Sequence, residues 1–180
     1  MNKDTIAVWD PLVRQFHWSL VLAFIVSWVS GDEWDDLHEI SGYLVVSLVA
    51  FRLIWGVIGS KYARFTQFVR SPAAVKQHVK DVLSFKGPRY VGHNPAGGIM
   101  ILLLLIMLAV TSLAGWLMTT DMFWGSEAME EVHEFGANSL LILVAVHVAG
   151  VVWESLLHCE NLARSMITGR KRKPSPEDIF

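Results

Sequence analysis

The chain has very little cysteine and lacks the common phosphate-binding motifs. Cys159 is the one cysteine among 180 residues, so an internal disulfide and a thiolate cluster are both excluded. No glycine-rich phosphate-binding loop occurs, and no segment is typical of nucleic-acid recognition. We therefore expect no nucleic-acid partner, and we expect any site to be built from other residue types.

Charged residues are scarce in four long apolar stretches. These are Leu12–Ser30, Leu37–Gly59, Pro95–Met118 and Val132–Leu157, and each approaches or exceeds the roughly 20 residues that cross a bilayer. The first stretch lacks a strongly basic start and an A-x-A-like cleavage site, which favours a membrane span over a signal peptide. We predict an all-α, integral membrane four-helix bundle that forms a single membrane domain over residues 1–180.

Lysine and arginine are absent from two of the three connections between these stretches. Residues 31–36 and 119–131 hold eight acids and no basic residue: Asp32, Glu33, Asp35, Asp36, Asp121, Glu127, Glu130 and Glu131. Residues 60–94 hold seven basic residues and one acid, and the tail 158–180 adds Arg164, Arg170, Lys171, Arg172 and Lys173. The positive-inside rule predicts that both termini and residues 60–94 are cytoplasmic, facing anionic lipid, and that the outer face is acidic.

Local signals mark the helix starts. Asp10 with Pro11, and Asn94 with Pro95, pair a capping side chain with a proline suited to the first helical position. Ser71 and the apolar stripe that follows predict a short amphipathic helix on the inner leaflet, with His78 at its surface.

Two histidines lie on one stripe of the last apolar stretch. His133 and His147 are 14 residues apart, close to four helical turns, so they project from nearly the same face at two membrane depths. Gly136 and Gly150 follow them by three residues, and Gly42 follows His38 by four, which predicts room for something flat and bulky. Lone histidines are usually core residues, but polar groups within lipid are costly and usually functional.

Depth pairs these histidines with two others. His17 and His147 both lie about 20 Å below the outer ends of their helices, whereas His38 and His133 both lie near the outer side. Two imidazoles facing each other across a bundle are expected to bind low-spin haem iron, and no C-x-x-C-H sequence is present to attach haem covalently. We therefore predict two non-covalent b haems with His17, His38, His133 and His147 as axial ligands. Zinc transport is disfavoured because zinc needs about four clustered ligands.

Two arginines are further candidates for cofactor binding. Arg14 is expected to contact either lipid phosphate or a cofactor group, namely a haem propionate or a quinone headgroup. Arg52 is expected to contact either a haem propionate or lipid phosphate. His93 is expected to bind a propionate or a loop group, and His158 remains a candidate for lining a quinone site near the inner haem.

Several motifs together resemble the bacterial cytochrome b561 family, including the cytochrome b subunits of nickel–iron hydrogenases. They are VWDPLVRQFHW, HEISGYLVVSLVAFRLIWG, GHNPAGG and HEFGANSLLILVAVHVAG with the ending HCENLARSMITGRKR. The resemblance covers nearly the whole chain. It implies a four-helix di-haem b protein of the bacterial inner membrane that exchanges electrons with quinone, with axial positions at His17, His38, His133 and His147.

Three functions remain open from the sequence. The first is electron transfer between quinone and a periplasmic redox partner, such as a c-type cytochrome or an oxidoreductase subunit, guided by the acidic connections unless these are simply solvated. The second is superoxide oxidation coupled to quinone reduction, which an acidic outer face disfavours because superoxide is an anion. The third is a non-redox membrane anchor. Whether the chain is itself an enzyme stays undecided.

Overall fold

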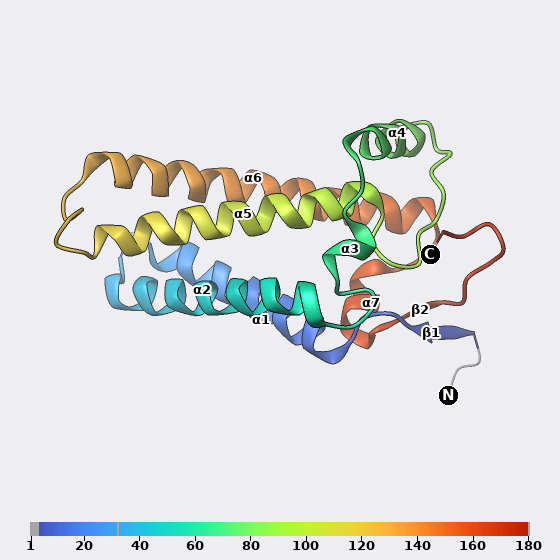
Figure 1. Ribbon diagram of the computed structural model, residues 1–180, viewed down its shortest axis with the longest axis horizontal. Helices are drawn as coiled ribbons and strands as arrows, with labels where there is room; N and C mark the ends of the chain where they lie inside the picture. Colours follow the sequence, from blue (N-terminus) through green and yellow to red (C-terminus); the bar gives the residue numbers. More distant parts are fainter. Residues whose placement is uncertain (1–3, 32, 180) are drawn as a thin grey trace. The chain divides into compact units, whose positions relative to one another are not determined.

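The computed structural model describes residues 4–31 and 33–179, so Asp32 of the acidic connection lies outside the described residues. In this part of the chain, seven helices and two short strands follow one another (Figure 1): β1 Thr5–Ala7, α1 Pro11–Ser30, α2 Asp35–Ile58, α3 Phe65–Phe68, α4 Pro72–Leu83, α5 Pro95–Met118, α6 Glu127–Leu157, α7 Leu162–Thr168 and β2 Arg170–Arg172. The all-α prediction is confirmed. The four-helix description is incomplete, because three short helices and a two-stranded sheet accompany the long helices.

The four long helices, α1, α2, α5 and α6, are each long and apolar enough to cross a membrane. Many of their large apolar side chains are exposed, including Leu22, Ile54, Ile106 and Ile142. In water such exposure would be unfavourable, whereas in a bilayer these side chains face lipid tails. The helix α6 starts five residues earlier than the predicted span, because Glu127 and Glu130 in its first turn complement the helix dipole.

The described residues fold into two compact units. The terminal unit comprises residues 4–14, 54–102 and 146–179, and the central unit comprises residues 15–31, 33–53 and 103–145. The boundary falls within the four long helices, so each of these helices contributes residues to both units.

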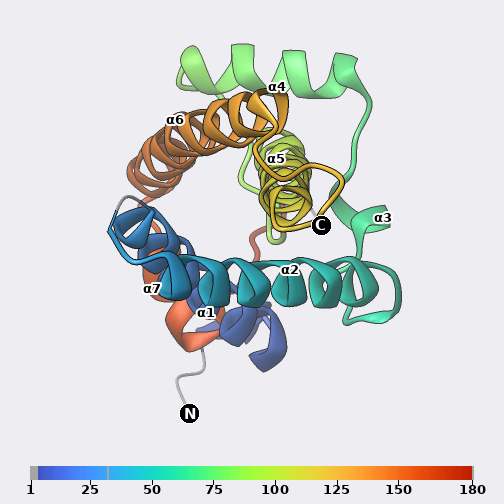
Figure 2. The ribbon, with the colours of Figure 1, turned by 90° about the vertical axis from the view of Figure 1, so that its left-hand side faces the viewer.

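In the central unit, α1 lies beside α2 and α5 lies beside α6 (Figures 1 and 2). The hydroxyl groups of Ser27 on α1 and Ser41 on α2 are 2.7 Å apart and share a hydrogen bond. The backbones of α5 and α6 approach closely, since a Cβ atom at Gly136 would clash with Oγ1 of Thr111 and lie 3.5 Å from its Cα. Small and hydroxyl-bearing residues are typical of such close packing between membrane helices.

The terminal unit joins the two ends of the chain. Strands β1 and β2 pair in antiparallel register, with Ile6 opposite Lys171. The side chain of Asp10 caps α1 by accepting a hydrogen bond from Val13 N at 2.9 Å, and Asn94 caps α5 by accepting one from Gly97 N at 2.6 Å. Both predicted caps are confirmed.

Although its place on the inner leaflet stays a prediction, the short helix expected after Ser71 is present as α4, with Ser71 as its cap. The prediction that His78 lies at its surface is wrong, since His78 is 3% exposed. The burial is caused by α6, because His78 faces Glu154, which the periodicity of α4 alone does not reveal.

Candidate functional site

Two of the four predicted ligand histidines face each other within the central unit. His38, near the start of α2, and His133, in the second turn of α6, have ring centroids 5.8 Å apart and ring planes at 78°. Both side chains are partly buried. This arrangement agrees with the pair that was expected on the outer side.

The tautomer of each ring is set by a backbone carbonyl. Nδ1 of His38 lies 2.8 Å from the carbonyl oxygen of Ser27, and Nδ1 of His133 lies 2.8 Å from that of Thr111. A carbonyl oxygen only accepts, so each Nδ1 must carry the hydrogen and donate it. In the neutral imidazole the lone pair then remains on Nε2. This backbone anchoring is the usual support for a histidine that binds a metal through Nε2.

A glycine on α5 leaves room for the ring of His133, and the other glycines near the histidines differ in what they face. A Cβ atom at Gly115 would lie 2.9 Å from both Cε1 and Nδ1 of the His133 ring, so glycine leaves the space that the ring occupies. The prediction that Gly136 leaves room for a flat group is wrong, because Thr111 fills that space. At Gly42 and Gly150 an added Cβ would meet no atom within 4 Å among the described residues.

A serine pair supports the backbone beneath His38. The hydroxyl of Ser41 donates to the carbonyl of His38 at 2.9 Å and also lies 2.7 Å from the Ser27 hydroxyl. Ser41 is 5% exposed. The carbonyl of Ser27 in turn accepts from the His38 ring, so the start of α2 is fixed to α1 on both sides of the histidine.

The other two predicted ligands belong to different units. His17 lies in the part of α1 within the central unit, and His147 lies in the part of α6 within the terminal unit. Both side chains are partly buried. Their pairing rests on the depth argument and stays a prediction.

The two candidate arginines differ in their surroundings. Arg52 on α2 is 3% exposed, which favours a group within the protein over lipid phosphate. Arg14 donates from its guanidinium to the carbonyl of Ile167 at 2.6 Å. Ile167 is in the last turn of α7, where unpaired carbonyls favour a cation. Arg14 therefore anchors α7, in addition to any role towards a cofactor.

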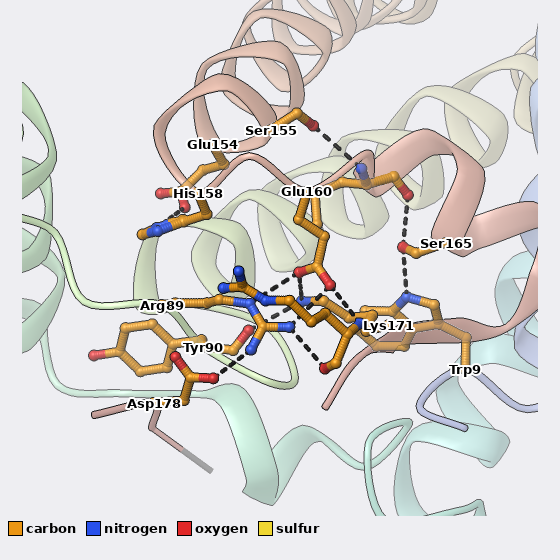
Figure 3. A network of polar contacts seen from close by, with 12 residues as sticks. Trp9, Arg89, Tyr90, Glu154, Ser155, His158, Glu160, Ser165, Lys171 and Asp178 are labelled. Carbon is orange, nitrogen blue, oxygen red and sulfur yellow. Dashed lines mark hydrogen bonds and ion pairs between the residues drawn. The ribbon is translucent and has the colours of Figure 1, made fainter. Parts of the chain in front are cut away.

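A second polar cluster lies in the terminal unit (Figure 3). Arg89 donates to Glu160, with Nη2 2.8 Å from Oε1, and also to Asp178. Lys171 Nζ lies 3.6 Å from the Glu160 carboxylate and donates to the carbonyl of Tyr90. Burial raises the pKa of Glu160, but hydrogen bonds from Arg89 and the Arg172 N–H, with the charge of Lys171, outweigh it and lower that pKa. Part of the basic charge of the tail is therefore neutralised by acids within the protein.

His93 and His158 also lie in the terminal unit. The His93 ring packs between the rings of Trp9 and Phe68, with centroids 4.5 and 4.7 Å away. Nε2 of His158 lies 3.2 Å from Oε2 of Glu154, one turn earlier on α6.

The comparison with protein families gives a match to the prokaryotic cytochrome b561 model over residues 8–169. The chain belongs to the prokaryotic cytochrome b561 family. Haem b and membrane electron transfer are properties of that class, and the four apolar helices agree with a multi-pass membrane protein.

The chain of this cytochrome is also similar to curated proteins described as probable Ni/Fe-hydrogenase B-type cytochrome subunits. The protein from Rhizobium leguminosarum bv. viciae is 26% identical, over 99% of this chain and 93% of its own length. Those from Bradyrhizobium diazoefficiens and Rhodobacter capsulatus are 23% and 22% identical, over 96% and 94% of this chain and 88% and 82% of their own lengths. No solved structure matches the chain.

The spacing of the His38 and His133 rings is suitable for binding one haem iron between them. Metal–imidazole bonds are about 2 Å long, so imidazole nitrogens on opposite sides of one iron are about 4 Å apart and the ring centres lie somewhat further apart. The ring centroids here are 5.8 Å apart, and both rings present Nε2 in the lone-pair form.

The backbone partners of these rings, Ser27 and Thr111, were missed by the sequence analysis. Their carbonyl groups leave no side-chain signal. Gly115 was identified as a position of close helix approach, and in the structure that approach is made to the His133 ring.

Proposed function

We propose that this cytochrome binds two b haems and passes electrons across the bacterial inner membrane, between the quinone pool and a periplasmic redox partner. The observation that carries the proposal is the pair His38 and His133, whose rings lie 5.8 Å apart with each Nδ1 anchored to a backbone carbonyl. In this proposal His38 and His133 hold the outer haem, and His17 and His147 hold the inner haem.

The bound haems would supply a reversible one-electron iron couple. The anchored rings of His38 and His133 would stay at fixed positions, so a change in oxidation state would need little rearrangement. With two histidines per iron no coordination position is left for oxygen, which favours electron transfer over oxygen activation. Burial makes Arg52 a candidate partner for a haem propionate or a quinone headgroup of the inner site.

The distribution of charge supports the proposed orientation and the proposed partner. Basic residues between α2 and α5 and in the tail favour a cytoplasmic position for both termini and for residues 60–94. The outer connections carry acids and no lysine or arginine, which suits a periplasmic partner with a basic docking surface, such as a c-type cytochrome or an oxidoreductase subunit. Asp35, Asp36, Glu127 and Glu130 also lie in the first turns of α2 and α6, where they complement helix dipoles.

The test is a haem count on purified histidine variants by pyridine haemochrome and reduced-minus-oxidised spectra. Wild-type protein is expected to hold two b haems per chain. His38→Ala and His133→Ala should each keep one haem, and the double variant should also keep one, because both residues serve the same haem. His38→Ala with His147→Ala should keep none.

Asn138→Ala is the matched control, because Asn138 is an exposed polar residue on the same helix, and it should keep two haems. One haem in the wild type, or none in the His38→Ala/His133→Ala variant, would overturn the pairing. In the same preparations, Arg52→Ala should slow haem reduction by quinol. Unchanged quinol-driven reduction at full haem content would remove Arg52 from the quinone and propionate role.

A further inference from the structure

A carboxylate flanked by two imidazoles lies in the terminal unit. Oε2 of Glu154 is 3.2 Å from Nε2 of His158, and Oε1 of Glu154 is 3.4 Å from Nε2 of His78. Figure 3 shows the His158 ring turned to the Glu154 carboxylate. His78 comes from α4 and is almost fully buried, whereas the side chains of Glu154 and His158 are each 14% exposed. Three titratable groups thus share two short contacts and remain in reach of solvent.

The cluster continues the histidine stripe of α6. Glu154 follows His147 by seven residues, two helical turns, so both side chains leave nearly the same face about 10 Å apart along the axis. His158 follows Glu154 by one further turn, and the backbone N–H of His158 donates to the backbone carbonyl of Glu154 at 3.1 Å. The same stripe therefore leads from a proposed haem ligand to this cluster.

We infer that Glu154, His78 and His158 form a proton-binding site whose occupancy follows the oxidation state of the haem proposed at His147. This inference rests on the proposed function. When one electron from quinol or another reductant arrives, one proton from the aqueous phase binds a ring nitrogen of one of the two imidazoles, and when the electron leaves the proton returns. An N–H bond forms as an O–H bond of hydronium breaks, the reverse occurs when the proton returns, and one positive charge enters for each negative charge.

The geometry of the cluster fits proton binding. Nε2 of each imidazole lies within 3.4 Å of the carboxylate, and neither Nε2 has a hydrogen-bond partner among the described residues. Nδ1 of His78 is buried and has no hydrogen-bond partner among the described residues. A protonated imidazole beside Glu154 gains an ion pair, which offsets the cost of its burial. Among the described residues no group of three histidine, cysteine or acidic side chains has metal-site geometry, so a metal ion is not the ligand that this cluster suggests.

Other titratable groups surround the cluster. The Tyr90 ring packs against His78 at 5.3 Å, and the charges near Tyr90 and Glu154 come from Arg70, Asp81 and Lys171. Burial raises the pKa of Tyr90, so its hydroxyl stays protonated. The neighbouring Arg89, Glu160 and Asp178 are held in ion pairs. Histidine is the side chain whose charge ordinarily changes between about pH 5 and pH 8.

The size of the coupling follows from Coulomb's law. His158 follows His147 by 11 residues, about 16 Å along the axis, and two unit charges at that distance and an effective dielectric constant of about 20 alter each other's binding about fivefold. The proton affinity of the cluster should therefore change about fivefold between the two oxidation states, and the haem potential should fall as pH rises across the titration. The steepest possible slope is tenfold per pH unit, which is about 59 mV for one electron.

The experiment is a potentiometric titration of the purified holoprotein between about pH 5.5 and pH 8.5, the range that spans histidine titration. The signal followed is the spectral component that is absent from His147→Ala. In Glu154→Gln the pH at which the potential changes should move down by about one unit or more, because the carboxylate no longer stabilises the protonated imidazole. His158→Asn should flatten the slope. Glu177→Gln, at an exposed acid of the tail, should give the wild-type curve.

A wild-type potential that is constant over this range would overturn the inference, as would curves for Glu154→Gln and His158→Asn that superimpose on the wild type. If a variant binds less haem, its curve is measured on the fraction that retains haem, because a potential does not depend on occupancy. If no spectral component disappears in His147→Ala, the proposed function has failed. A haem that is present with a pH-independent potential counts against the proton site alone.

Discussion

At the scale of single residues, His133 depends on two neighbours that do not bind the cofactor themselves. The carbonyl of Thr111 fixes the hydrogen of His133 on Nδ1, and Gly115 leaves the space in which the ring lies. A ring that turns by one rotamer would lose the carbonyl contact and direct Nε2 elsewhere. The orientation of this proposed haem ligand is thus decided by backbone and by a missing side chain.

Gly115→Ala tests this dependence. The added Cβ would lie 2.9 Å from two atoms of the His133 ring, so the ring must move and its bond to Thr111 must weaken. We expect haem affinity at the outer site to fall about tenfold or more, as for other lost partners of metal-binding histidines. Haem titration of the apoprotein measures it. Val110→Ile, which adds a methyl group at an exposed position of α5, should leave the affinity unchanged, and equal affinities in the two variants would contradict the role of Gly115.

At the scale of elements, the segment after α6 is held by ion pairs. Glu160 accepts hydrogen bonds from the Arg89 side chain and from the Arg172 N–H, and Asp178 meets the same arginine. Strand β2 and the residues after it are thereby fixed to the loop that precedes α5. The sequence predicted a basic tail. The structure shows that two acids of the same segment, Glu160 and Asp178, form ion pairs with Arg89, and that Glu160 also pairs with Lys171.

The lowered pKa of Glu160 gives this network a pH dependence. Its folded pKa lies below the unfolded value, so its contribution to stability is present above about pH 4.3 and is lost as pH falls through the folded pKa. Glu160→Gln should cost about 3 kcal/mol near neutral pH, because Arg89 loses a buried partner. It should also reduce the loss of stability on acidification. Thermal unfolding in detergent at several pH values measures both effects.

Glu177→Gln, at an exposed acid of the same segment, serves as the control and should unfold like the wild type. A Glu160→Gln protein that unfolds at the wild-type temperature at pH 7 would show that Asp178 alone suffices for Arg89.

The four long helices and α4 could be predicted from the sequence, whereas α3, α7 and the two strands could not. Runs of apolar residues fix α1, α2, α5 and α6, because a bilayer requires a minimum length regardless of what the helix packs against. Strands β1 and β2 have three residues each and exist only because they pair with each other across most of the chain. The burial of His78 likewise depends on Glu154, far away in sequence. Depth arguments placed His38 near His133, but the carbonyls that orient them needed the structure.

At the scale of the whole molecule, charge predicts how the chain lies across the membrane. Alkaline phosphatase inserted after Trp124, between α5 and α6, should be active because that connection is expected to be periplasmic. The same enzyme fused after the tail should be inactive, whereas a fluorescent protein there should be bright. The positive-inside rule is the reason, since it retains residues 60–94 and the tail in the cytoplasm. Active phosphatase at the tail would reverse the orientation and the position of the proposed partner.

The pairing of β1 with β2 also sets the order in which parts of the protein can fold. Residues 5–7 pair with residues 170–172, and the Trp9 indole donates a hydrogen bond to the Ser165 hydroxyl. The first residues therefore cannot reach their final contacts until residues 165–172 have been made. At about 5–20 residues per second, roughly 10–30 s pass before those partners leave the ribosome. All residues of the central unit, His38 and His133 included, are made before the last segment of the terminal unit. The two proposed haem sites are therefore completed at different times, and a chain cut short after residue 145 would carry the residues of one and not of the other.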